Sequence, residues 1–335
     1  MNTNQEALKL LKLYWSNYEH SCFSKTNVGN SGCDVFIGRD AVFKFCPQGI
    51  NYWQKLSFQN ELIILSQLSG KIGEINIPEI IKSESTISCK EAYLQTKIEG
   101  QSLSEIIKNN PNLAESIFAN DNFINSIASF LVDFNQELTS KKIDPLKTHT
   151  LTMMSDDNLD LLKEKAPITY LLFDYIKKQY EKSNNKFCWT HNDLNFENIF
   201  IDNNNKISII DFGEATRINP LLAIGKIFYS LNLNGEFELP WKISQRAHEL
   251  SPKLFPSPKE VIAFSILPHI NKLHFKLLSA KNNIDSLFHD IELISKKLFL
   301  QSNIDWKLDQ EQILDKIKKI KSFVAKTCNK GLKNN

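Results

Sequence analysis

The chain has 335 residues, of which 42% are hydrophobic and 23% are charged, and its formal net charge is +2. These values are typical of a globular protein and exclude extensive disorder, and the near-neutral charge gives no reason to expect a nucleic-acid partner. The six cysteines are scattered without a C-x-x-C pair, which indicates reduced thiols rather than a disulfide framework or a zinc site. The sequence shows neither a signal peptide nor a membrane-length apolar run, so we expect a cytoplasmic protein that does not associate with membranes.

The first hundred residues alternate between helical and strand-like patterns. Leucines at helical spacing on residues 52–70 predict a helix, with Gly70 as its C-terminal stop. The other expected elements are a helix over 5–19, strands over 26–38 and 40–46 joined at Gly38–Asp40, and strands over 78–85 and 91–100. We therefore expect an N-terminal domain over 1–100 that is rich in β-structure and has one main helix.

After residue 101 the hydrophobic periodicity is mostly helical. Two short strands, over 198–203 and 206–212 and joined by an Asn203–Asn205 turn, interrupt it. Helices are expected over 102–109, 122–138, 168–182, 257–281 (with Ser257 as N-cap) and 309–326. The pattern predicts an α+β fold, in which an antiparallel sheet lobe precedes a larger, mostly helical lobe over 101–335.

The stretch WTHNDLNFENIF, residues 189–200, places many polar side chains between two apolar segments. A turn explains one or two such residues, because Asn and Asp bond to their own backbone, but it does not explain this number. His191, Asp193 and Asn198 are spaced as in the catalytic loop of the kinase fold, and the run IIDFG at 209–213 matches its metal-binding segment. The two segments together predict a kinase fold.

These residue types suit phosphoryl transfer. A carboxylate must accept the proton of the acceptor hydroxyl, and we expect Asp193 to be this catalytic base. Oxygen ligands must hold Mg²⁺ beside the triphosphate of ATP, and Asn198 and Asp211 are the expected metal ligands. Gly213 is expected to let the chain turn sharply after Asp211. His191 is expected to brace the loop through a backbone hydrogen bond rather than to act in catalysis.

The N-terminal domain contains residues suited to grip a nucleotide. Lys44, in the strand AVFKFC, can reach the α- and β-phosphates of ATP, and Glu61 in the following helix is its expected partner. An ordinary exposed helix position is the alternative for Glu61. The segment NVGNSGCDV lacks a complete G-x-G-x-x-G, yet its backbone N–H groups, at Ser31 and Gly32, can cover the phosphates.

The run YLQTKIEGQSL, residues 93–103, leads from a strand through a linker into a helix. A crossing of this kind exposes main-chain groups to an adenine base. Thr96 and Ile98 are the expected contacts, and a plain connection between the two domains is the compatible alternative.

The sequence resembles the aminoglycoside phosphotransferase and choline kinase superfamily over about residues 25–230. The resemblance rests on HNDLNFENIF, IIDFGEA, the lysine strand, the helix glutamate and IEGQSL. H-N-D in place of the H-R-D of protein kinases, and the lack of an A-P-E element, favour this branch. One departure is that ATRINPLLAIGKIFYSL has no acid, where many relatives place an aspartate at a helix start. The resemblance implies ATP- and Mg²⁺-dependent transfer of the γ-phosphate to a hydroxyl of a small molecule.

The acceptor stays open between an amino alcohol, a sugar and an aminoglycoside-like antibiotic. An acidic cluster would suit a polycation but also fits a solvated helix face: Asp156, Asp157, Asp160 and Glu164. An aromatic set would suit a choline-like cation but also fits a core: Trp241, Phe255, Phe275 and Trp306. Two other functions are a kinase acting on a protein or other macromolecule, and a nucleotide-binding module without catalysis. The intact Lys44, Asp193, Asn198 and Asp211 argue against the latter.

Overall fold

The computed structural model describes twelve stretches of the chain. They are residues 7, 9, 11–12, 23–26, 33–47, 49–85, 91–146, 156–183, 186–232, 238–258, 262–270 and 284–301. The chain forms two compact units, Met1–His149 with Trp189–Ile218 and Thr150–Cys188 with Asn219–Asn335. The first unit contains two five-stranded sheets and the second is helical, which confirms the α+β class. A domain boundary near residue 100 stays a prediction.

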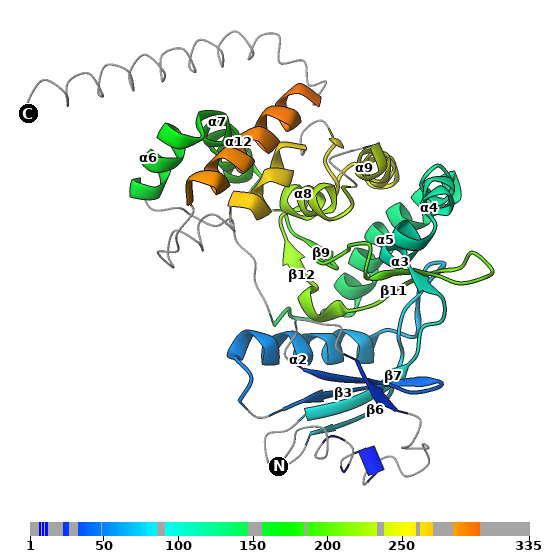
Figure 1. Cartoon of the computed structure of the whole chain (residues 1–335). Coiled ribbons are helices and arrows are strands. Elements are labelled where there is room, and N and C mark those ends of the chain that lie inside the picture. Colours follow the sequence, from blue (N-terminus) through cyan, green and yellow to red (C-terminus); the bar gives the residue numbers. More distant parts are fainter. Residues whose placement is uncertain are drawn as a thin grey trace, which may run out of the picture. The chain divides into compact units, whose positions relative to one another are not determined.

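The first sheet of unit 1 is antiparallel, with the order β1-β2-β3-β7-β6 (Figure 1). One of its faces is apolar and packs Phe36, Phe43, Phe45 and Leu94 into a buried cluster. Because strand side chains alternate, Lys44 and its neighbours two residues away project from the other face, toward helix α2. The strands are β1 (Ser24–Lys25), β2 (Asp34–Ile37), β3 (Ala41–Cys46), β6 (Ile80–Ser85) and β7 (Glu91–Thr96).

Helix α2 (Tyr52–Gln67) begins where the sequence predicts and ends three residues before the expected stop at Gly70. The Asn51 side chain accepts a hydrogen bond from the Gln54 backbone N–H at 2.9 Å, which satisfies a donor that the first turn leaves unpaired. Gly70, with φ +73°, lies just past the C-cap. The buried face of α2 includes two polar residues, Asn60 and Glu61, and both serve the site described below.

The second sheet of unit 1 has the order β4-β5-β11-β10-β8. The expected hairpin is present, with Ile199 opposite Ile209, and Asn205 in its turn has φ 60°. Gly100 has φ +109°, and a Cβ there would overlap the Ile201 carbonyl oxygen, so only glycine fits. The strands are β4 (Lys71–Ile72), β5 (Ile75–Asn76), β8 (Gln101–Ser102), β10 (Ile199–Ile201) and β11 (Ile207–Ile209).

Helix α5 (Asp121–Ser140) supplies much of the core beneath the second sheet's loops, with Phe130 stacked on Phe134 at 5.5 Å between ring centroids. The remaining elements of unit 1 are α3 (Leu103–Asn109), α4 (Pro111–Phe118), the 3-10 turn η2 (Phe212–Glu214), and β12 (Thr216–Ile218), which pairs with β9 (Cys188–Thr190). Phe134 in turn contacts Phe212 at 5.7 Å. This aromatic stack fixes the segment that follows Asp211.

Unit 2 is held together by a buried carboxylate as well as by apolar packing. Glu292 accepts hydrogen bonds from the backbone N–H groups of Ile168 and Thr169, both at 3.1 Å, at the start of α7. The described elements of this unit are α6 (Asp156–Lys165), α7 (Pro167–Lys182), α8 (Pro220–Ser230), α9 (Glu238–Leu250), η3 (Ile262–Ile266) and α12 (Ile284–Gln301). Of the helix expected over 257–281, residues 258 and 267–270 are helical, residues 262–266 form a 3-10 turn, and residues 259–261 and 271–281 lie outside the described residues. The helix expected over 309–326 also lies outside them.

The helix start that lacks an acid is capped by an amide. Asn219 accepts a hydrogen bond from the Leu221 N–H at 2.9 Å, and its Nδ2 donates to Ser183 Oγ at 2.8 Å. Within unit 2, Asn219 thus ties the first turn of α8 to the end of α7. An amide can both accept and donate here, a pair of roles that an ionised aspartate cannot fill.

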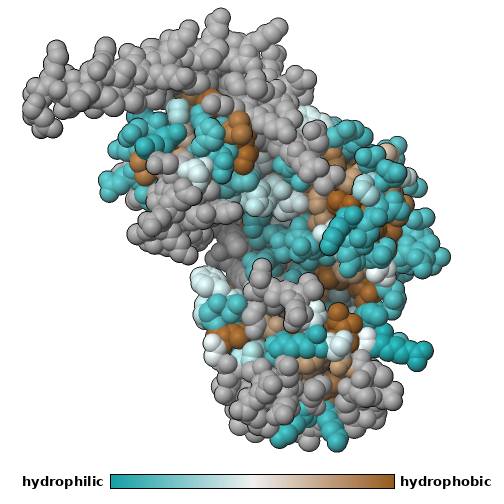
Figure 2. Space-filling model, in the orientation of Figure 1, coloured by the Kyte–Doolittle hydropathy of each residue, from teal (hydrophilic) through white to brown (hydrophobic). Residues whose placement is uncertain are grey.

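On the face shown in Figure 2, hydrophilic side chains cover most of the described surface, and hydrophobic ones form small separate groups. No helix in the described parts of the chain is both long and apolar enough to cross a membrane.

Candidate active site

The loop between β9 and β10 is braced by His191, as the sequence predicts. The His191 side chain is buried, and its Nε2 lies 2.9 Å from the carbonyl oxygen of Ile210. A carbonyl only accepts, so Nε2 carries the proton and donates. This leaves Nδ1 without a proton and, among the described residues, without a hydrogen-bond partner. The ring meets Phe212 edge-on at 4.7 Å. Burial lowers the pKa of His191 to about 4, so the ring is neutral at pH 7.

Asp193 is held in place by two amide side chains. Asn195 Nδ2 donates to Asp193 Oδ1 at 3.2 Å, and Asn198 Nδ2 donates to the Asp193 carbonyl at 2.8 Å and to its Oδ2 at 3.1 Å. Burial raises the pKa of Asp193 to about 6, and the negative charge of Asp211 adds to this effect, although both amides oppose it. The carboxylate is therefore oriented by neutral donors and destabilised by a neighbouring charge.

Asp211 takes the sharp turn that the sequence analysis assigned to Gly213. Its φ is 64°, in the left-handed region, whereas Gly213 lies inside the turn η2 without a positive φ. The Gly213 assignment was wrong because the glycine serves packing instead: a Cβ there would lie 3.3 Å from Ser57 on α2. Left-handed backbone at a non-glycine residue costs free energy and is often found at functional sites.

Helix α2 grips the segment after Asp211. Asn60 Nδ2 donates to the Ala215 carbonyl at 2.8 Å and to the Gly213 carbonyl at 3.1 Å. Ser57 Oγ donates to Glu214 Oε1 at 2.8 Å. These contacts connect the helix that carries Glu61 to the segment that carries Asp211, so the two acidic residues are positioned by shared elements of unit 1.

Lys44 and Glu61 form a buried ion pair. Lys44 Nζ lies 2.8 Å from Glu61 Oε1 and 2.7 Å from Oε2, and the Tyr93 hydroxyl donates to Oε2 at 2.7 Å. Burial alone would lower the pKa of Lys44, but the charges of Glu61 and then Asp211 outweigh it and raise the pKa. Burial and the Glu61 charge raise the pKa of Tyr93 well above its usual value, so the phenol stays protonated as a donor.

Asn198 and Asp211 retain oxygen atoms suited to a hard cation. Asn198 uses its Nδ2 on Asp193, which leaves the amide oxygen directed elsewhere. Among the described residues, none donates a hydrogen bond to the Asp211 carboxylate, and its charge is felt at both Lys44 and Asp193. One amide oxygen and one carboxylate are a small protein ligand set of the kind that Mg²⁺ accepts, because it keeps waters and binds substrate phosphates.

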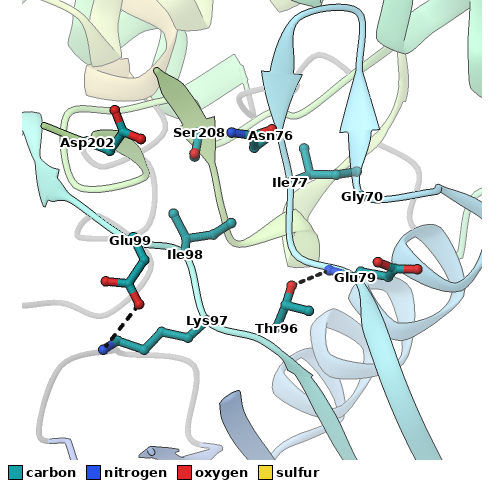
Figure 3. A pocket seen from close by; sticks show the side chains of 10 residues that line it. All are labelled: Gly70, Asn76, Ile77, Glu79, Thr96, Lys97, Ile98, Glu99, Asp202 and Ser208. Atoms are coloured by element: carbon teal, nitrogen blue, oxygen red, sulfur yellow. Dashed lines mark hydrogen bonds and ion pairs between the residues drawn. The ribbon is translucent and has the colours of Figure 1, made fainter. Parts of the chain in front are cut away.

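Thr96 and Ile98 both line a cavity of about 280 Å³ beside the linker after β7 (Figure 3). The Thr96 N–H donates to the Glu79 carbonyl, and its hydroxyl accepts from the Glu79 N–H, each at 2.9 Å. The Thr96 N–H and hydroxyl are thus both bonded to Glu79, the residue before β6. Among the described residues, no hydrogen bond engages the backbone of Ile98. The backbone groups of Ile98 are therefore more available to a nucleotide base than those of Thr96.

Several predicted residues belong to unit 2 or lie outside the described residues. Ser31 and Gly32 lie outside them, as do Phe275 and Trp306. Within unit 2, Asp157, Asp160 and Glu164 are exposed on α6, Phe255 is buried, and Trp241 packs edge-on against Phe228 at 6.3 Å. These positions favour a solvated helix face and a core over a cation site.

The sequence analysis missed three residues that organise the site: Tyr93, Asn60 and Asn195. Asn60 carried a usable signal, because it adjoins Glu61 and the helical periodicity places both beside the apolar face of α2. Tyr93 carried none, since an aromatic residue in a strand is ordinary. Asn195 lies within the quoted polar stretch but has no fixed place in the kinase motif.

The sequence matches the phosphotransferase enzyme family over residues 29–233, which is more than half of the chain. A comparison with curated proteins gives no match.

The fold is similar to that of solved aminoglycoside phosphotransferases, and this confirms the predicted kinase-like architecture. A mutant of aminoglycoside 2'-phosphotransferase-IIIa in complex with GDP is 15% identical, with a TM-score of 0.61 over 89% of this chain and 99% of that one. The GDP and kanamycin complex of APH(2")-IIIa is 16% identical, with a TM-score of 0.57 over 88% and 98%. A thermostable mutant of APH(4)-Ia with ADP and hygromycin B is 12% identical, with a TM-score of 0.51 over 87% and 98%.

Proposed function

Because the chain belongs to the phosphotransferase enzyme family, we propose that it transfers the γ-phosphate of ATP, with Mg²⁺, to a hydroxyl group of a small molecule. The observation that carries the proposal is the convergence, within unit 1, of Asp193, Asn198 and Asp211 with the Lys44–Glu61 ion pair.

Asp193 is the proposed catalytic base. It accepts the proton of the acceptor hydroxyl as the oxygen attacks the γ-phosphorus and the bond to the leaving ADP breaks. The hydrogen bonds from Asn195 and Asn198 fix its orientation, and its raised pKa, about 6, matches a group that must take up a proton near neutral pH. The base remains mostly ionised at pH 7 and so is ready to act.

Lys44 is the proposed ligand of the α- and β-phosphates. Its charge is retained in a buried position by Glu61, and Tyr93 satisfies a second acceptor site on that carboxylate. A rigid, charged donor can stabilise a triphosphate without first losing its own water shell. The backbone of Ile98 is the proposed contact for the base, and Ser31 and Gly32 remain proposed phosphate contacts.

Asn198 and Asp211 are the proposed Mg²⁺ ligands. When bound, Mg²⁺ neutralises charge on the phosphates and helps to orient them. The chain's own part is to hold both oxygen ligands beside the base: Asn198 through its hydrogen bonds to Asp193, and Asp211 through the turn that Asn60 and Phe212 stabilise.

A small acceptor is favoured over a protein. Helix α8 begins at Pro220, nine residues after Asp211, which leaves no room for an activation segment of the length found in protein kinases. Kanamycin and hygromycin B are present in two of the similar structures, so polyhydroxylated amines belong in any acceptor screen, together with amino alcohols and sugars. The catalytically inactive alternative would require the intact Lys44, Asp193 and Asp211 to serve nucleotide binding alone.

The test is an ADP-release assay with ATP or GTP and either Mg²⁺ or excess EDTA, across amino alcohols, sugars, aminoglycosides and a mixed peptide substrate. We expect Mg²⁺-dependent release stimulated by a member of the small-molecule set, and mass spectrometry should find that compound heavier by one phosphate. Stimulation by the peptide mixture alone would favour a protein kinase. Nucleotide binding without release under any condition would favour the inactive module.

A further inference from the structure

Two cysteines face each other across the first sheet, at the end of the strand that carries Lys44. Strands β2 and β3 pair with Asp34 opposite Phe45, so the next step of the register places Cys33 opposite Cys46. The Gly38 N–H donates to the Ala41 carbonyl at 2.9 Å, which makes that pair a hydrogen-bonded one. Hydrogen-bonded and non-hydrogen-bonded pairs alternate along antiparallel strands. The pair Cys33–Cys46 is five pairs from Gly38–Ala41 and is therefore a non-hydrogen-bonded pair.

This kind of pair suits a disulfide. Cα atoms of a non-hydrogen-bonded pair lie about 4.5 Å apart, with the side chains close together, and disulfides span Cα distances of about 4.4–6.8 Å. A bond between the two sulfurs therefore requires no movement of the strands. Both residues are free thiols in this structure and pack in one cluster with Phe58 and Tyr93.

The two thiols also interact directly. A hydrogen bond between the side chains, donated by Cys33, lowers the pKa of Cys46 and raises that of Cys33. The charge of Lys44 lowers the pKa of Cys33, whereas that of Glu61 raises it. In the same way, Lys55 lowers the pKa of Cys46 and Glu91 raises it. Cys46 is buried, at 2% exposure, whereas Cys33 is partly exposed, so Cys33 is the sulfur that a small oxidant can reach.

We propose that Cys33 and Cys46 form a reversible disulfide, a modification site on the nucleotide-facing side of the sheet, with a peroxide as the oxidant. Cys46 first releases its proton to solvent, and the Cys33 proton then moves along the hydrogen bond to Cys46, which leaves the Cys33 thiolate. This thiolate attacks one peroxide oxygen, the O–O bond breaks, and the departing hydroxide takes the proton from Cys46 to become water. The Cys46 thiolate then attacks the sulfur of the Cys33 sulfenic acid, the S–S bond forms as the S–O bond breaks, and the departing hydroxide takes up the proton released to solvent and becomes the second water. The thiols lose two electrons and two protons, and one peroxide becomes two waters.

The full-length protein provides a direct test, because Arg39 and Lys44 separate the two cysteines on trypsin digestion. Protein treated with one equivalent of hydrogen peroxide is alkylated and digested without reductant, and the fragments are identified by mass spectrometry. We expect the fragment of residues 26–39 linked to that of residues 45–55, two of the six thiols lost to alkylation, and full recovery with dithiothreitol.

Two variants distinguish this pair from general oxidation. Cys33→Ser should abolish the linked fragment, whereas Cys188→Ala, which removes a buried thiol elsewhere, should leave it unchanged. The oxidised wild type should also melt at a higher temperature than the reduced protein, because a cross-link restrains the unfolded chain, and Cys33→Ser should lose this rise. The proposal is overturned if oxidised, folded wild type lacks the linked fragment, or if Cys33 is linked to a cysteine other than Cys46. Neither readout depends on the protein being an active kinase.

Discussion

Asp193 in unit 1 is a partly buried carboxylate and Glu292 in unit 2 is a buried one, yet their hydrogen-bond partners and neighbouring charges differ. Glu292 accepts backbone N–H bonds from Ile168 and Thr169 and a hydroxyl bond from Thr169, so the partial positive charge of a helix start compensates its charge. Among the described residues, the Asp193 carboxylate accepts hydrogen bonds only from two neutral amides, and the charge of Asp211 raises its pKa further. The first arrangement provides the carboxylate with backbone and hydroxyl donors. The second arrangement raises the free energy of the ionised Asp193 carboxylate, so this carboxylate accepts a proton more readily.

The comparison predicts opposite consequences for activity and stability when each charge is removed. Asp193→Asn should lower the rate of ADP release by at least about a hundredfold, because the base is lost from the transfer step. The variant should be at least as stable as the wild type at pH 7, since the raised pKa means that the ionised carboxylate opposes folding. Steady-state kinetics and urea unfolding measure the two effects.

Asp144→Asn, at an exposed position of the same unit, is the matched control and should change neither quantity. Near-normal turnover in Asp193→Asn would remove Asp193 from the mechanism. A marked loss of stability would instead place it with Glu292, as a structural carboxylate.

The Lys44–Glu61 pair is an intermediate case, in which the charge of a carboxylate is compensated by a cation. Lys44→Met and Glu61→Gln should each lower turnover on the order of tenfold or more, because a displaced phosphate ligand costs a large part of the rate. The double variant should be little worse than Lys44→Met alone, since residues that act as one unit are not additive. Multiplying effects in a double-mutant cycle would mean that the ion pair has no joint role.

His191 extends the comparison to a buried base, because burial lowers its pKa by more than the nearby charge of Asp211 and the hydrogen bond to Ile210 raise it. Its pKa is about 4 in the folded protein and about 6.5 when unfolded, so between these values the unfolded chain binds a proton that the folded protein does not. Stability contributed by the neutral ring is present above about pH 6.5 and is lost as the pH falls toward 4. Between pH 7 and pH 5 the loss should be about 2 kcal/mol.

Asp193 titrates in part of the same range with the opposite sign, so the measurement is a difference between wild type and His191→Asn. Urea unfolding at pH 7, 6 and 5 should show the wild type losing stability relative to the variant as the pH falls. Parallel pH profiles would show that the ring is protonated in the folded protein, which contradicts the absence of an acceptor at Nδ1.

The site residues that the sequence predicts are those that lie in short local sequence patterns. Asp193 and Asn198 lie five residues apart in one loop, and Lys44 and Glu61 sit in adjacent elements with clear periodicity. The rest depends on contacts between distant segments. Tyr93 reaches Glu61 across 32 residues and Asn60 reaches Gly213 across 153, and neither leaves a local pattern.

The fold shows the same limit. The hairpin β4–β5 escaped prediction because each strand has two residues, too few for any alternation to be visible. A 3-10 turn at Ile262–Ile266 lies within the segment expected as an α-helix over 257–281, and within unit 2 this turn packs closely against α8, where a Cβ on Gly225 would overlap Phe264. Such close packing is decided by the partner helix and not by local propensity.

Glu292 supplies the smallest and most specific prediction, because it isolates the structural half of the comparison. Its partners at the start of α7, Ile168 and Thr169, are 124 and 123 residues away in sequence, so the carboxylate joins two helices. A hydrogen bond between the Thr169 and Ser295 hydroxyls, at 2.7 Å, joins the same helices. Glu292→Gln keeps the size of the side chain and one oxygen but removes the charge that faces the N–H groups of Ile168 and Thr169. The free energy of unfolding should fall by about 1 kcal/mol, the value of a charge at a helix start, while ADP release per folded molecule stays unchanged. Asp290→Asn, exposed on the same helix, should leave both quantities as they are. Equal stability of the two variants would mean that the hydrogen bonds of Glu292 to the start of α7 do not stabilise the fold, and a fall in turnover would give Glu292 a part in function that its surroundings do not indicate.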